Sequence, residues 1–544
     1  MARESAAVAG LRRELGERLA LCRKAAGMTQ AQLAAAVFCD RSRLAHLEKG
    51  RGSADERFWR AADEALQAGG VLVRTVLEFR AALTEQENHL REVELATIRE
   101  RIAAWEGSRQ AMQEVTEPFP PAAIGGDLTA AMEWLDARVG WTPGTARLRV
   151  SDWINGSRGR LMRDAGCRGR VGRERLAVEL ARYYGGEGLF TGAFGEIATR
   201  TSILTRPEWL EVGGELTADR DQLQLVLGNG SAPRLTERNV DAAVRRLAEA
   251  EIGQVRIADA PIYRLLRTNV GHERIAGEVE VASFIEYALT ADLLESELVD
   301  AIGAGRPARP GSLLLRDAQL PDRAAVLDVG NRLCAGGVLA LTAIARPAEV
   351  HRGPADYVVL VQRRSGQVLN AGGRLAVIPK GFHGPMVDYR GDARIGATLL
   401  RELEEELFGR ADVDSTTGPQ RAAAPMHPSR LSDPMRWLTE VPGRMRLDFT
   451  GFGLNLVSGN YEFAGLVVVE DEEFWARFGG AIEANWETIG LRQFSTLDHA
   501  ALAELVRDQG WSNEGLFALL LGLRRLTETG KDRVDLPEIG WELQ

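Results

Sequence analysis

The sequence predicts a multidomain α/β protein: an all-α N-terminal domain, a long helical connector, a mixed α/β middle region and a C-terminal α/β/α sandwich. Three observations lead to this fold class. A chain of 544 residues is too long for a single hydrophobic core. Apolar residues follow helical spacing up to about residue 106, whereas apolar runs typical of buried strands occur after residue 321. Between these regions, residues 116–126 (TEPFPPAAIGG) have the proline and glycine content of a linker.

The composition and the placement of charge limit the possible functions. An apolar content of 45% and an aromatic content of 6% are ordinary for a soluble protein. The net charge of −10 argues against a chain coated by nucleic acid. Residues 1–60, however, carry 12 Lys and Arg against 7 Asp and Glu, so this segment is basic and the remainder is acidic. Such a distribution suits local contact with phosphates by one small domain.

Cysteine usage and hydropathy predict a cytoplasmic protein without a membrane partner. Cys22, Cys39, Cys167 and Cys334 are far apart and form no CxxC pair, which fits a reducing compartment and argues against a zinc site built from cysteines. The sequence has no run of about 18 apolar residues and no apolar stretch of a signal peptide near its start.

Residues 29–50 have the pattern of two short helices joined by a tight turn. Gln30 begins the first helix, and the small side chain of Ala34 lets the two helices cross closely. Asp40 and Ser42 can both cap the second helix by accepting its unpaired backbone N–H groups.

The second of these helices has an inward and an outward side. Leu44 and Leu47 are expected to point into the domain at helical spacing. The outward residues are Arg41, Ser42, Arg43 and His46. A helix of this length fits the DNA major groove, where Arg reaches guanine edges and Gln reaches adenine edges.

Residues 29–50 resemble the helix-turn-helix of the phage-repressor-like (XRE, Cro-type) regulators, and the resemblance covers about residues 1–70, with leading and closing helices at 11–26 and 55–66. It implies binding to double-stranded DNA. The contacts it implies are Gln30, Arg41, Ser42, Arg43 and His46. Phe38 stands at the turn position that usually holds glycine, so the turn must close without a residue that easily adopts positive φ. The alternative is a helical hairpin of an unrelated domain with solvated arginines.

Residues 71–110 predict a long helix with an apolar seam close to a heptad repeat. One interpretation is a coiled coil that makes a homodimer, because regulators of this type usually read two half-sites. The alternative is a helix packed on its own chain, since Gln86 and a shift of register interrupt the seam. A linker is expected at 111–126.

Residues 127–320 form a mixed α/β region of unknown function, with helices expected at 176–184, 240–251 and 281–302 and strands at 223–227 and 254–257. Within it, the segment 157–175 is dense in arginine and interleaved with glycine. Arg168 and Arg170 are candidates to bind a phosphate-bearing ligand. The alternative is a solvated loop that pairs with the acidic body.

Residues 321–528 carry the second informative pattern, followed by a tail at 529–544. Strands are expected at 337–345, 357–362 and 374–378, before a helix at 393–408. On this helix Glu402, Glu405 and Glu406 cluster beside an apolar face. Three converging carboxylates repel one another unless a cation lies among them, and such oxygen ligands suit Mg²⁺ or Mn²⁺.

The segment Arg401–Glu406 (RELEEE), with the strand and PKG loop before it, resembles the Nudix family over roughly residues 325–525 and implies a Nudix-like sandwich. By that resemblance Glu402, Glu405 and Glu406 bind the metal and Arg401 orients them. Arg374 and Lys380 are candidates to hold phosphate oxygens, and a later acid, Glu462 or Glu470, to add a ligand or base. The signature is incomplete: Ala393 stands in place of its glutamate, and Val387 and Phe408 stand in place of its glycines.

Together these patterns predict a dimeric transcriptional regulator, actinobacterial in type, whose Nudix-like domain senses a nucleotide-derived small molecule. The degraded signature on a retained fold favours ligand binding over turnover. One alternative is a metal-dependent Nudix pyrophosphohydrolase that the N-terminal domain tethers to DNA. Another is an interaction protein of the antitoxin or phage-defence type, whose C-terminal part binds a protein.

Overall fold

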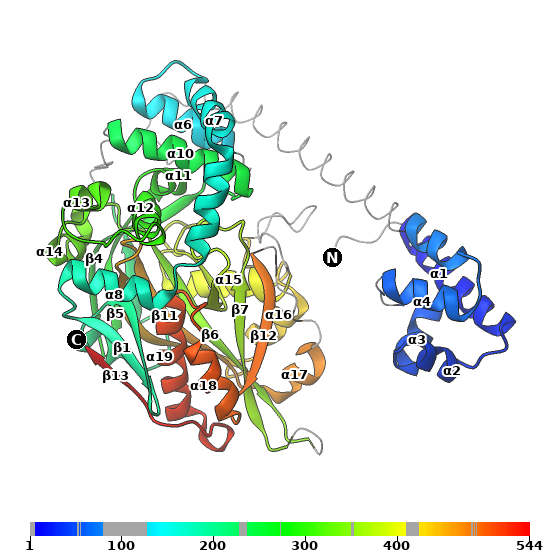
Figure 1. Cartoon of the computed structure of the whole chain (residues 1–544). Coiled ribbons are helices and arrows are strands. Elements are labelled where there is room, and N and C mark those ends of the chain that lie inside the picture. The colour runs from blue at the N-terminus through cyan, green and yellow to red at the C-terminus, as the bar shows by residue number, and fades with distance from the viewer. Residues whose placement is uncertain are drawn as a thin grey trace, which may run out of the picture. The chain divides into compact units, whose positions relative to one another are not determined.

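The computed structural model describes residues 6–51, 54, 56–79, 128–227, 235, 237–272, 274–349, 353–409, 424–479, 482, 485 and 487–543. The chain divides into two compact units, Met1–Pro120 and Pro121–Gln544 (Figure 1). Residues 71–79 are helical, at the start of the predicted connector. The remainder of that connector, residues 80–110, and the predicted linker, residues 111–126, lie outside the described residues. The proposed coiled coil therefore stays a prediction.

The first unit packs short helices around one apolar core. Its helices are α1 (Ala6–Ala25), α2 (Gln30–Ala36), α3 (Arg41–Glu48), α4 (Glu56–Ala65) and the helical residues 71–79. The core side chains include Leu15, Leu19, Leu33, Leu44, Leu47, Phe58 and Trp59. The Asp63 carboxylate accepts hydrogen bonds from the backbone N–H groups of Gly70 (2.6 Å) and Leu72 (2.7 Å), and so caps the helix that begins at residue 71. The leading and closing helices predicted from the sequence are both present.

A helical layer opens the second unit. It consists of α6 (Leu128–Val139), α7 (Thr145–Gly169), α10 (Glu237–Gly253), α11 (Phe284–Ala288) and α12 (Leu293–Gly303), and α7 packs against α6, α10 and α12. α8 (Arg173–Tyr184) follows α7 after a short turn. The arginines of segment 157–175 therefore lie on or directly beside helices, and not in the solvated loop that was the alternative interpretation.

Two predicted elements of this region differ from the structure. Residues 281–302 were expected to form one helix, but strand β5 continues to Ser283 and the helix is divided into α11 and α12. The Ser283 hydroxyl caps α11 by accepting hydrogen bonds from the N–H groups of Ile285 (3.2 Å) and Glu286 (3.5 Å). Residues 254–257 were expected to form a strand, but they form a turn and extended chain outside any sheet.

The second unit contains two sheets. The smaller has the order β3-β5-β4, from β3 (Asp221–Leu225), β4 (Pro261–Gly271) and β5 (Arg274–Ser283). The larger has the order β12-β7-β6-β11-β10-β2-β1-β13, with β8 beside β7 and β9 beside β6. Its strands are β1 (Leu189–Phe194), β2 (Ile197–Leu204), β6 (Gly336–Arg346), β7 (Asp356–Arg364), β8 (Leu375–Val377), β9 (Lys380–Phe382), β10 (Met445–Asn455), β11 (Tyr461–Val469), β12 (Thr488–Ser495) and β13 (Ile539–Leu543).

The larger sheet joins segments that the sequence placed in different domains. β1 and β2 come from the middle region, and β13 comes from the expected tail and pairs antiparallel with β1. β2 then pairs with β10 through Leu204 and Ile203, opposite Leu454 and Asn455. The region 127–320 and the last residues thus complete the sheet of the C-terminal region.

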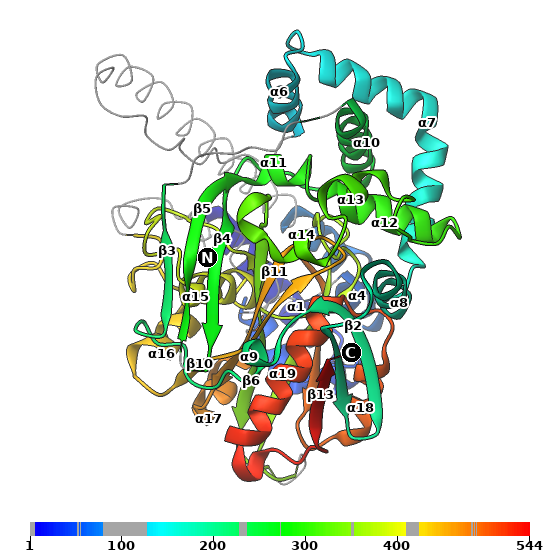
Figure 2. The ribbon, with the colours of Figure 1, turned by 90° about the vertical axis from the view of Figure 1, so that its left-hand side faces the viewer.

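Helices cover both faces of the larger sheet (Figure 2). Val338 and Ala340 of β6 share a core with Leu403 of α15 (Ile395–Leu407), whereas Leu339 and Leu341 pack with α19 (Asn513–Thr529) on the opposite face. This alternation agrees with the predicted α/β/α layering. The remaining helices are α9 (Pro207–Leu210), α13 (Leu314–Gln319), α14 (Arg323–Leu327), α16 (Asp433–Glu440), α17 (Glu472–Phe478) and α18 (His499–Arg507). Within the described ranges, no helix combines the length and apolarity needed to cross a bilayer.

Candidate functional site

The helix pair α2–α3 is fixed at its start by local capping. Thr29 and Gln32 form a capping box, in which the Thr29 hydroxyl accepts from the Gln32 N–H (3.2 Å) and the Gln32 side chain accepts from the Thr29 N–H (2.8 Å). Asp40 lies at the N-cap of α3 with extended backbone, but its side chain makes no capping hydrogen bond. Ser42 is the second residue of α3, so the prediction that it caps the helix was wrong.

The turn between α2 and α3 closes on Phe38 in a left-handed conformation. Phe38 has φ 53° and is 97% exposed. The turn thus closes without glycine, as the sequence implied, and Phe38 itself takes the positive φ.

We expect Phe38→Gly to stabilise the first unit by about 0.5–1 kcal/mol. The left-handed conformation costs a residue with a Cβ roughly 1–2 kcal/mol. Glycine avoids this cost, but it loses about 0.5–1 kcal/mol more backbone entropy on folding, so the net gain is smaller. The exposed ring has little packing to lose. Urea unfolding followed by circular dichroism measures the change, and Phe38→Ala is the control because it removes the ring but keeps the Cβ. Equal stability of the two variants would contradict the strain argument.

An open hollow lies along α3, from its N-cap to the residues just after its end. Its volume is about 700 Å³, and it is lined by Asp40, Arg41, Ser42, Arg43, His46, Leu47 and Arg51. Arg41, Ser42, Arg43 and His46 are all exposed, whereas Leu44 and Leu47 are buried as predicted. The structure therefore brings together four of the five predicted DNA contacts. Arg51, which follows the glycine after α3, was missed because the sequence motif was taken to end at Gly50.

Gln30, the fifth predicted contact, lies in a different environment. Its side-chain Nε2 donates to the Glu48 carboxylate (2.7 Å), which also pairs with Arg23 (2.5 Å). Burial by itself raises the pKa of Glu48, but the hydrogen bonds from Arg23 and Gln30 outweigh it and lower that pKa. In this structure Gln30 thus ties the start of α2 to the end of α3.

The three glutamates predicted to cluster on α15 are largely buried, and protein groups bind the carboxylates of Glu402 and Glu406. The Glu402 carboxylate accepts from Arg401 Nη2 (2.8 Å), and Arg401 also donates to two backbone carbonyls of the β9 region. Glu406 is fully buried and accepts from the backbone N–H of Lys380 (2.7 Å). Glu405 is half-buried on the neighbouring side of the helix. Glycine is required at Gly381, because an added Cβ would lie 2.0 Å from the Glu402 carboxyl carbon.

The positive charge beside these carboxylates comes from guanidinium groups. Arg364 of β7 lies 3.6 Å from Glu406 and 3.0 Å from Glu487, and it is itself buried. Burial, and then the charge of Glu487, raise the pKa of Glu406 well above its ordinary value. Within the described part of the chain, no three His, Cys, Asp or Glu side chains come together in a way that could hold a metal ion. The residues present do not fit Mg²⁺ or Mn²⁺, because guanidinium groups supply the cations that the acids need.

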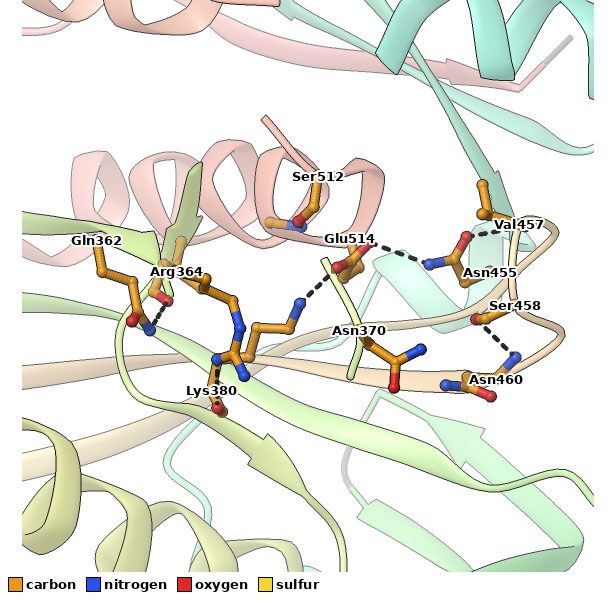
Figure 3. A network of polar contacts seen from close by, with 12 residues as sticks. Gln362, Arg364, Asn370, Lys380, Asn455, Val457, Ser458, Asn460, Ser512 and Glu514 are labelled. Atoms are coloured by element: carbon orange, nitrogen blue, oxygen red, sulfur yellow. Dashed lines mark hydrogen bonds and ion pairs between the residues drawn. The ribbon is translucent and has the colours of Figure 1, made fainter. Parts of the chain in front are cut away.

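Three of the four predicted phosphate-binding residues make described contacts within the protein, and the fourth, Arg170, is exposed. Arg168 pairs with Glu249 (2.7 Å) and with Asp300. Arg374 donates to the backbone carbonyl of Val171. Lys380 Nζ lies 2.5 Å from Glu514 at the start of α19 (Figure 3). Glu514 was not singled out from the sequence, since it lies 134 residues from Lys380 along the chain.

Comparison with known proteins gives one match to a family model. Residues 14–76 match the model described as a helix-turn-helix domain, which spans α2 and α3. The comparison with curated proteins gave no match. Among solved structures, the crystal structure of the clp gene regulator ClgR from Corynebacterium glutamicum is 26% identical, with 18% of this chain and 93% of that chain covered and a TM-score of 0.12. A TM-score this low does not indicate a shared overall fold. The family match places a helix-turn-helix domain, a DNA-binding module of regulators, in the first unit.

Proposed function

We propose that this protein is a sequence-specific DNA-binding transcriptional regulator that inserts α3 into the major groove of double-stranded DNA. The observation that carries the proposal is the hollow over α3, where Arg41, Arg43, His46 and Arg51 surround one space in a domain that matches the helix-turn-helix model. Arginine donates two hydrogen bonds to guanine O6 and N7, and it also neutralises phosphates. The basic charge of residues 1–60 in an otherwise acidic chain supports the same proposal.

The packing of α3 against the core of the first unit supports the proposal that its outer side chains are held rigidly for DNA recognition. Leu44 and Leu47 anchor the inner side of the helix, and the contacts of Glu48 with Arg23 and Gln30 hold its end. A helix fixed in this way presents its outer side chains in one orientation, which base recognition requires. Arg51 extends the basic surface past the end of α3, where we expect it to bind a phosphate.

We further propose that the protein acts as a homodimer and that its second unit senses a nucleotide-derived small molecule through a Nudix-like sandwich. Support for sensing comes from the incomplete Nudix signature, in which Ala393 stands in place of the glutamate, together with the helices on both faces of the larger sheet. The pairing of the α15 carboxylates Glu402 and Glu406 with Arg401 and Arg364 favours binding over hydrolysis. A ligand that prefers one state of the dimer would change the affinity for operator DNA.

The test is binding of the purified full-length protein to its own promoter DNA across a salt series, with and without nucleotide-derived metabolites and Mg²⁺. We expect specific binding with a negative slope of log affinity against log salt. A metabolite recovered intact that changes this affinity supports the sensor, and a cleaved metabolite supports the hydrolase instead. Equal affinity for the promoter and for unrelated DNA would reject sequence-specific regulation.

A further inference from the structure

The turn between α2 and α3 holds the backbone of Phe38 in a fixed conformation. The Phe38 N–H donates to the carbonyl of Ala35 (3.4 Å), and the Cys39 N–H donates to the carbonyl of Ala34 (2.9 Å). This pair of hydrogen bonds is the Schellman motif that ends many helices, and its left-handed position is usually glycine. Phe38 occupies that position with φ 53°. The ring is therefore carried by a backbone that is fixed at the end of α2.

The ring of Phe38 takes no part in the core of the first unit. Val37 on one side of it is buried, and Cys39 on the other side packs against the core. The side chain of Phe38 between them is 97% exposed. Among the exposed large apolar side chains of the described residues, it is the only aromatic one. The folding of the unit therefore does not account for an aromatic residue at this position.

The conformation and the exposure of Phe38 both work against the stability of the first unit. A residue with a Cβ is strained in the left-handed conformation, which glycine adopts without that cost. An aromatic ring in water also gains nothing from the hydrophobic effect. Residues held in such conformations cluster at functional sites. Phe38 therefore indicates a contact with another molecule.

Phe38 lies next to the surface with which α3 is proposed to read DNA. The hollow along α3 begins at Asp40, and the Cα atoms of two residues at this separation are at most about 7.6 Å apart. Arg41 and Arg43 are exposed and line the same hollow. Basic side chains attract the phosphates of DNA, so a duplex bound along α3 would come close to the ring of Phe38. The ring and the hollow thus form one continuous surface toward DNA.

The major groove offers one group that suits an aromatic ring. Thymine carries a 5-methyl group there, whereas the other bases are distinguished by their hydrogen-bond donors and acceptors. The ring of Phe38 cannot form such hydrogen bonds, but it can bury a methyl group away from water. The arginines of α3 suit guanine, so the ring would add a preference for thymine beside the guanine contacts.

We infer that Phe38 is a specificity-determining residue, whose ring packs against the 5-methyl group of a thymine next to the bases that α3 contacts. This inference rests on the proposed DNA-binding function and adds a base preference that comes from the turn before α3. It also accounts for the residue at the glycine position of the motif. Glycine at position 38 would relieve the strain, but it would remove the ring that contacts DNA.

The test compares two promoter duplexes of the same sequence, one with thymine and one with deoxyuridine at every thymine position, which removes only the 5-methyl groups. Fluorescence anisotropy measures their affinity for the full-length protein. We expect the unmodified protein to bind the deoxyuridine duplex at least about fourfold more weakly, which is the effect of burying one methyl group. In Phe38→Ala, the ratio of the two affinities should fall by about the same factor.

Leu21→Ala is the matched control for Phe38→Ala. Leu21 is also an exposed apolar residue of the first unit, but it lies on α1 and does not line the hollow. Its removal should change the affinity for either duplex by no more than about twofold. Circular dichroism checks that both variants stay folded. The inference is overturned by an equal thymine preference in the unmodified protein and in Phe38→Ala, or by equal losses in the two variants.

Other contacts of the ring, and failure of the proposed function, give different results. If Phe38→Ala loses the same affinity for both duplexes, the ring contacts the sugar–phosphate backbone and not a thymine. If it changes the sedimenting mass of the protein without DNA and keeps the thymine preference, the ring lies between two copies of the chain. Either result rejects the thymine contact alone. Equal affinity for the promoter and for unrelated DNA would reject the proposed function itself.

Discussion

Replacing Arg41 and Arg43 together with alanine is expected to reduce the affinity for operator DNA by about 2–6 kcal/mol, since each good bidentate contact to a base contributes about 1–3 kcal/mol. Both side chains are exposed and line the hollow over α3, and neither supports the core, so the unit should stay folded. Fluorescence anisotropy with promoter DNA and with a scrambled duplex measures the loss. We expect a larger loss on the promoter than on the scrambled duplex.

Arg18→Ala is the matched control for this experiment. Arg18 is an exposed arginine of the same unit, but it lies on α1, pairs with Glu14 (2.6 Å) and does not line the hollow. Its removal should leave promoter affinity within about 0.5 kcal/mol. If Arg18→Ala weakens binding as much as the double variant does, binding is driven by net charge, and the assignment of α3 as the reading helix is wrong.

The elements predicted well from the sequence are those with a local signal. Thr29 and Gln32 satisfy each other within one turn of helix, so the start of α2 could be placed from the capping pattern. The apolar runs of β6 and β7 are buried on nearly every position, so a continuous apolar pattern was enough to predict both strands. The helix α15 was likewise recognisable from its leucines at helical spacing.

The errors arose where distant segments decide the structure. β13 has no pattern that distinguishes it from a tail. It becomes a strand because β1 offers an unpaired edge, although Phe190 of β1 and its partner Leu543 lie 353 residues apart in the sequence. Residues 281–302 have helical spacing throughout, but pairing of β5 with β4 takes their first residues into a sheet. Local periodicity cannot report such pairing.

The candidate functional residues also divide into those that local sequence predicts and those that distant segments decide. The outward residues of α3 follow from helical spacing alone, and the structure places them around one hollow. The environment of Glu406 could not be predicted, because Arg364 and Glu487 approach it from β7 and from just before β12. Three carboxylates on one helix suggested a metal ion, but a guanidinium from a neighbouring strand meets the same electrostatic need.

Arg364→Ala is expected to destabilise the second unit by about 3–5 kcal/mol, the usual cost of removing one partner from a buried ion pair. Arg364 also donates to the backbone carbonyl of Lys380 (3.1 Å), so the variant leaves that carbonyl without this donor and two carboxylates without this cationic partner. Thermal unfolding of the full-length protein, followed by calorimetry, should show a lower transition temperature for the second unit and an unchanged transition for the first.

Arg363→Ala is the control for this loss, because Arg363 is the preceding residue of β7 but is exposed, and its side chain donates to the carbonyl of Gly373 (3.1 Å). It should change stability by no more than about 0.5 kcal/mol. Thermal unfolding with added metal ions also tests whether the α15 carboxylates bind a divalent cation. If Arg364 supplies the cation, Mg²⁺ or Mn²⁺ leaves the transition of the unmodified protein unchanged. A rise of that transition with either metal, abolished by Glu406→Gln, would show that the α15 carboxylates bind a divalent cation after all and would reopen the case for a hydrolase.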